Sequence, residues 1–87
     1  MSAGLAAVAH LADLLCLPQS QRDAIFALGE QELKSGKTEQ AIETLQVAAH
    51  LDPLNPVRWR RLGEALRAGG RVPEANLYTQ YALELAQ

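Results

Sequence analysis

The chain repeats itself at a spacing of 34 residues, and this period constrains its fold more than any other feature. Residues 22–55 and 56–87 carry amino acids of the same kind at matched positions. The first stretch has Ile25, Leu28, Gly29, Ala41, Leu45 and Ala48, and the second has, in the same order, Trp59, Leu62, Gly63, Ala75, Thr79 and Ala82. A fixed period of this length is typical of proteins that stack one helix–turn–helix unit on the next.

Proline and glycine divide the chain into five segments with helical periodicity. The predicted helices cover residues 3–17, 20–35, 39–51, 56–68 and 73–86. Ser20 and Asn55 stand where N-caps of the second and fourth helices are expected, and Gly36 can end the second helix in a left-handed conformation. Alanine and leucine dominate and β-branched residues are few, which favours helix over strand. Because the connections are short, neighbouring helices are expected to be antiparallel.

Both repeats resemble the tetratricopeptide repeat (TPR) family. The resemblance is carried by the segments "IFALGEQELKSGKTEQAIETLQVAAHLDPLNP", "WRRLGEAL" and "EANLYTQYALEL". It implies an all-α fold of antiparallel helical hairpins, a fragment of a right-handed solenoid. It implies one domain over residues 1–87, with an N-terminal helix in 1–19 and repeats in 22–55 and 56–87. Gly29 and Gly63 are implied to let paired helices approach closely.

The resemblance also implies where a partner binds. In the TPR family the first helix of each repeat lines a concave surface that holds a peptide. The matched positions here are Asp23, Phe26, Glu30 and Leu33 in the first repeat, and Val57, Arg60, Glu64 and Arg67 in the second. A second contact surface is expected at Leu5, Val8, Leu15, Leu77 and Tyr81, on the first and last helices.

Five of the eight basic residues lie in residues 58–71, although the formal net charge is -2. On a helix, Arg60 and Arg67 share a face with Glu64, whereas Arg58 and Arg61 lie on the opposite side. We expect Arg58 and Arg61 to be solvated. The cluster in sequence is thus dispersed in space, which does not favour a nucleic-acid interface.

No pattern in the sequence indicates a catalytic, metal or cofactor site, so we expect no enzyme activity. His10 and His50 are isolated and have no second ligand at metal spacing. Cys16 is the only cysteine, so no internal disulfide can form and a reducing compartment is expected. The apolar N-terminal run is too short to span a bilayer and lacks the features of a signal peptide. A cytoplasmic location is therefore expected.

These observations favour a protein-binding module. The first hypothesis is a small cytosolic chaperone or adaptor that sequesters an amphipathic segment of a partner, because the chain resembles the small TPR-type chaperones of bacterial type III secretion. That resemblance implies a partner that is a secretion component, in a heteromeric complex. The alternative is a TPR scaffold that associates with itself. A nucleic-acid binder is the least favoured hypothesis.

Overall fold

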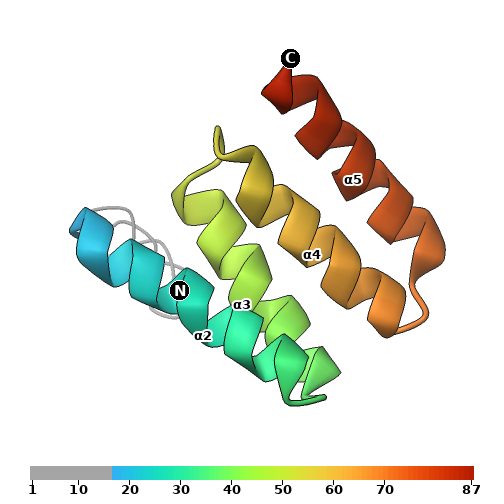
Figure 1. Cartoon of the computed structure of the whole chain (residues 1–87), viewed down its shortest axis with the longest axis horizontal. Helices are drawn as coiled ribbons and strands as arrows, with labels where there is room; N and C mark the ends of the chain where they lie inside the picture. The colour runs from blue at the N-terminus through green and yellow to red at the C-terminus, as the bar shows by residue number, and fades with distance from the viewer. Residues whose placement is uncertain (1–16) are drawn as a thin grey trace, which may run out of the picture.

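The computed structural model describes residues 17–87, and within this range the regular secondary structure is entirely helical. The helices are α2 (Gln19–Lys34), α3 (Thr38–Leu51), α4 (Pro56–Ala68) and α5 (Val72–Ala86). They follow one another in a row, and each runs antiparallel to the next (Figure 1). The predicted all-α hairpin architecture is confirmed, and the predicted bounds of these helices differ from the observed bounds by at most one residue. The helix predicted over residues 3–17, with Leu5, Val8 and Leu15, lies almost wholly outside the described residues.

Most helix ends follow the expected punctuation. Asn55 caps α4, since its side-chain Oδ1 accepts a hydrogen bond from the Val57 N–H at 3.0 Å. Gly36 and Gly70 have φ angles of 78° and 79°, a left-handed conformation that costs glycine little and lets the chain reverse after α2 and α4. The prediction that Ser20 caps α2 is wrong. The helix already begins at Gln19, and no side chain caps it.

The core lies mainly between α3, α4 and α5. Its buried members are Ala41, Ile42, Leu45, Ala49, Trp59, Leu62, Ala65, Leu66, Ala75 and Ala82. Glycine lets the paired helices come close, as expected. A Cβ atom on Gly29 would lie 2.6 Å from Leu45 Cδ2, and one on Gly63 would lie 2.8 Å from Thr79 Oγ1. Contacts this short leave no room for a side chain, so each hairpin depends on its glycine.

Trp59 connects α4 to α3, to α5 and to the loop that precedes α4. Its indole N–H donates to the Pro53 carbonyl at 2.8 Å. Its ring lies nearly parallel to Tyr78, at 5.5 Å between centroids, and meets the rings of Tyr81 and His50 edge to face at 5.3 and 5.2 Å. These are favourable aromatic geometries. Trp59 therefore anchors the second repeat to the first.

Candidate functional site

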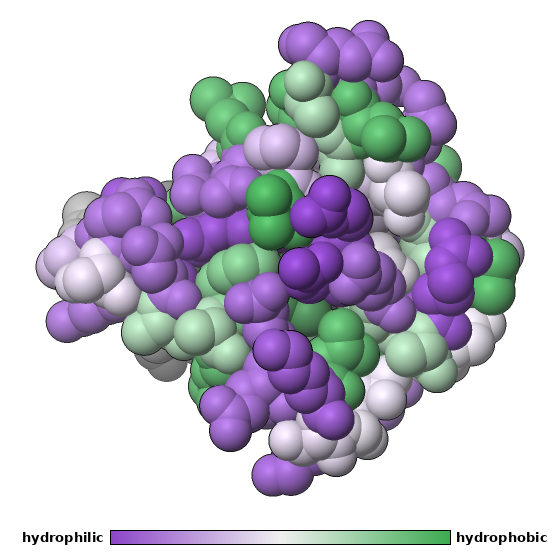
Figure 2. Space-filling view, in the orientation of Figure 1, coloured by the Kyte–Doolittle hydropathy of each residue, from purple (hydrophilic) through white to green (hydrophobic). Residues whose placement is uncertain are grey.

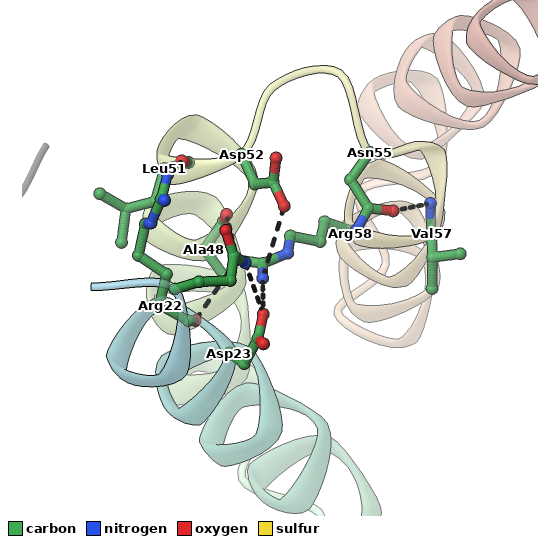
Figure 3. A network of polar contacts seen from close by, with 9 residues as sticks. Arg22, Asp23, Ala48, Leu51, Asp52, Asn55, Val57 and Arg58 are labelled. Carbon is green, nitrogen blue, oxygen red and sulfur yellow. Dashed lines mark hydrogen bonds and ion pairs between the residues drawn. The ribbon is translucent and has the colours of Figure 1, made fainter. Parts of the chain in front are cut away.

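The α2–α3 pair presents a surface to α4, and the side chain of Arg58 lies at one end of it, between the start of α2 and the end of α3 (Figure 3). Arg58 is only 1% exposed. Its Nη1 donates to the carbonyl oxygens of Ala48, at 3.0 Å, and of Arg22, at 3.3 Å. Its Nη2 donates to Asp23 Oδ1 at 2.6 Å and lies 3.6 Å from Asp52 Oδ2.

The guanidinium of Arg58 also lies over the ring of Phe26, 5.2 Å from its centroid. We call the five residues that receive it the Arg58 seat; they are Arg22, Asp23, Phe26, Ala48 and Asp52. A buried charge is stable only when it is paired and hydrogen-bonded. The seat pairs the guanidinium with carboxylates and supplies acceptors to both Nη atoms, whereas the buried Nε has no acceptor within residues 17–87. The expectation that Arg58 is solvated is therefore wrong. Its side of α4 faces α2 and α3, not water.

Arg61 makes a second connection between α4 and α2. Its Nε donates to Glu30 Oε2 at 2.9 Å, and its Nη1 donates to Glu64 Oε1 at 3.1 Å. The hydrogen bond to Glu30 is the main reason that the pKa of Arg61 is raised above its ordinary value. Arg61 is half-buried, so the expectation of a solvated side chain is wrong here too.

The first-repeat half of the predicted groove is engaged within the chain. Asp23 and Phe26 contact Arg58, and Glu30 contacts Arg61. Phe26 and Leu33 are half-buried and pack against the core. Because α4 contacts these residues, the second-repeat half of the predicted groove is the more open of the two.

The second-repeat half of the predicted groove is exposed on α4. Val57 and Arg60 help to line a hollow of about 270 Å³, which we call the α4–α5 hollow; its other lining residues are Pro56, Thr79, Ala82, Leu83 and Ala86. The other two groove residues lie further along α4. Glu64 is held by Arg61, and Arg67 Nη2 donates to Asn76 Oδ1 at 2.8 Å. Within residues 17–87, Arg60 has no ion-pair partner.

The α4–α5 hollow is formed by residues of the second repeat that correspond in sequence to the Arg58 seat of the first repeat. The residues that follow the five seat residues by 34 positions all line the hollow; they are Pro56, Val57, Arg60, Ala82 and Ala86. The two remaining lining residues, Thr79 and Leu83, correspond to Leu45 and Ala49, which are fully buried in the first repeat. The α4–α5 pair thus exposes the surface that the α2–α3 pair covers with a helix.

A second concave region lies on the other side of α5. Leu77 and Tyr81, both predicted contact residues, line it together with Trp59, Glu74 and Tyr78. Its volume is about 430 Å³, and Leu77 is 71% exposed. The structure thus brings Leu77 and Tyr81 together. The remaining members of this predicted surface belong to residues 1–16, which the structure does not describe.

On the face shown in Figure 2, apolar side chains form separate patches among polar ones, some of them near the C-terminal end of α5. Within residues 17–87, no helix is long and apolar enough to cross a membrane, and no group of three or more His, Cys, Asp or Glu residues could hold a metal ion. No protein-family model matches the chain, and no curated protein matches it.

Proposed function

We propose that the protein is a TPR-type protein-binding module that covers an amphipathic segment of another protein at the α4–α5 hollow. The observation that carries the proposal is the correspondence between the hollow and the Arg58 seat. Matched residues are covered by a helix in the first repeat and open in the second. A surface that one repeat covers with a helix suits the same kind of ligand in the next.

The exposed side chains around the hollow also suit a protein ligand. Val57 and Leu83 are 38% and 57% exposed, and the alanines beside them leave room for a neighbouring helix. Covering two such side chains stabilises a complex by roughly 2–3 kcal/mol before the cost of association is counted. A mixed surface with an apolar floor and an exposed arginine is typical of a site for an amphipathic segment.

The role as a chaperone or adaptor rests on the sequence resemblance. The small TPR-type chaperones of type III secretion cover an amphipathic segment of a secretion component in the cytoplasm. The same role here accounts for an open surface that matches the one covered by a helix in the first repeat. We propose no enzymatic activity.

The arginines of residues 58–71 give little support to nucleic-acid binding. Arg58, Arg61 and Arg71 each pair with a carboxylate of the chain. Cationic side chains bind a phosphate backbone by neutralising phosphates and displacing the counterions condensed on them, which requires cations that are not already paired. Because Arg58, Arg61 and Arg71 are already paired within the chain, protein binding is favoured over nucleic-acid binding.

Leu83→Asp tests the proposed function. We expect it to weaken partner binding by about tenfold or more, because it places a charge in an apolar contact surface, and to leave the fold intact because Leu83 is exposed. A partner recovered from the source cells, purified and titrated by isothermal titration calorimetry, supplies the measurement.

Leu28→Asp is the matched control, because Leu28 is exposed to nearly the same degree as Leu83, 54% against 57%, and lies on α2, outside the lining of the hollow. It should bind the partner as the unaltered protein does. Unchanged affinity of Leu83→Asp, or an equal loss of binding by Leu28→Asp, would move the site away from the hollow. A dimer in sedimentation that Leu83→Asp disrupts would support the self-associating scaffold instead.

A further inference from the structure

The charges around the α4–α5 hollow differ from those around the Arg58 seat, and the difference specifies a partner. Resting on the proposed function, we infer that the hollow selects a partner helix that directs a carboxylate at Arg60. The same hollow discriminates against a helix with a cation at the place that Arg58 takes in the first repeat. The ligand class is therefore an amphipathic helix with an acidic residue beside its apolar stripe.

The two carboxylates of the seat have no charged counterparts in the hollow. Asp23 and Asp52 lie 2.6 and 3.6 Å from Arg58 Nη2 and balance its charge. Their counterparts in the hollow are Val57 and Ala86, which carry no charge. Backbone carbonyls can still accept hydrogen bonds there, but they do not neutralise a buried cation. A guanidinium placed in the hollow would be left without a counter-ion, and this is strongly unfavourable.

Arg60 places a positive charge at the edge of the hollow. Arg60 is the residue that corresponds to Phe26, whose ring lies against the guanidinium of Arg58 in the first repeat. A cation on the partner helix would therefore meet a cation. Arg60 is exposed and has no ion-pair partner within residues 17–87, whereas Arg61 is bound to Glu30 and Glu64. It is thus available to a carboxylate, which a guanidinium can bind through two parallel hydrogen bonds.

A second copy of this chain could also place a helix in the hollow, but it would bring no carboxylate to Arg60. The helices of this chain that start each repeat carry Ala24 and Arg58 at the matched position. Neither offers a carboxylate to Arg60. The charge pattern therefore favours a different protein over a copy stacked in the same register.

The experiment uses three fluorescein-labelled peptides that copy residues 54–70, the segment that fills the seat in the first repeat. One keeps Arg58, and the others carry Arg58→Ala or Arg58→Glu. Each is titrated with the full chain, and fluorescence anisotropy gives the dissociation constant. We expect the Glu peptide to bind about tenfold or more tightly than the Arg peptide, with the Ala peptide between them.

Two variants of the protein test whether Arg60 causes the difference in affinity among the three peptides. Arg60→Glu should reverse the order, so that the Arg peptide binds most tightly. Arg71→Glu makes the same change of charge beyond the far end of α4 and outside the lining of the hollow, and it should leave the order unchanged. Equal affinities, a preference for the Arg peptide, or no measurable binding of the Glu peptide would each overturn the inference.

These outcomes are separable from failure of the proposed function. If Leu83→Asp abolishes binding of the natural partner but Arg60→Glu does not change the peptide order, the hollow remains the site and the charge selection is wrong. If Leu83→Asp leaves partner binding intact, the proposed function itself fails. A dimer that depends on Leu83 would assign the hollow to a second copy and overturn the inference.

Discussion

Arg58→Ala is expected to lower the free energy of unfolding by about 3 kcal/mol. The substitution removes a side chain that is 1% exposed and leaves the carbonyls of Arg22 and Ala48 without their donor. Asp23 is largely solvated, and this keeps the loss below that of a fully buried pair. Urea unfolding followed through the fluorescence of Trp59, the only tryptophan, gives the value.

Arg60→Ala is the matched control, because it removes the same kind of side chain from the same helix. Arg60 is exposed and lacks an ion pair within residues 17–87, so the free energy of unfolding should change by less than about 0.5 kcal/mol. Equal effects of the two substitutions would contradict the buried position of Arg58. Arg58→Lys should retain only part of the stability, since an ammonium group cannot span the carboxylate and both carbonyls.

Trp59→Ala is expected to cost about 4 kcal/mol of unfolding free energy. The residue is 6% exposed, and its ring contacts three other aromatic rings from α3 and α5. Removing it leaves a cavity and the Pro53 carbonyl without its donor. Since small domains are stable by only about 5–15 kcal/mol, this variant should be close to unfolding at moderate temperature. Thermal unfolding followed by far-ultraviolet circular dichroism measures the change.

Trp59→Phe separates the ring from the hydrogen bond. It keeps an aromatic ring at the junction but loses the indole N–H, and we expect a cost of about 1–2 kcal/mol. A cost as large as that of the alanine variant would mean that the hydrogen bond to Pro53 dominates. A negligible cost for Trp59→Ala would show that the second repeat does not depend on this junction.

Local chemistry explains why the sequence predicts the helices well. Gly36, Gly70 and Pro56 act on the backbone around them, so their effect is readable without knowing the fold. The cap at Asn55 is equally local. The cap expected at Ser20 fails because α2 already begins at Gln19, which places Ser20 inside the first turn of the helix.

Burial depends on what lies against a residue, and the period does not specify this. Leu28 and Leu62 are matched by the repeat, yet Leu28 is 54% exposed and Leu62 is fully buried. The helix that carries Leu62 lies between α3 and α5, whereas α2 lies at the end of the described row (Figure 1). Position within the stack therefore decides burial at matched positions.

The sequence predicts only part of the candidate site, because the period does not specify which residues lie against one another. Helical geometry correctly places Arg58 opposite Arg60, but it does not say that α2 and α3 supply carboxylates and carbonyls there. The residues that α5 contributes to the hollow, such as Leu83, were not predicted. The period carries the missing signal, because a shift of 34 residues converts the seat into the hollow once the contacts of Arg58 are known.

The most direct test of the central claim is to locate the bound peptide on the protein. Amide chemical shifts of the full chain are recorded by nuclear magnetic resonance during titration with the Arg58→Glu peptide. The largest changes are expected at the α4–α5 hollow, at Val57, Arg60, Thr79 and Leu83. Changes centred on Leu77 and Tyr81, or no saturable change at the hollow, would contradict the claim that this surface is an open helix-binding site.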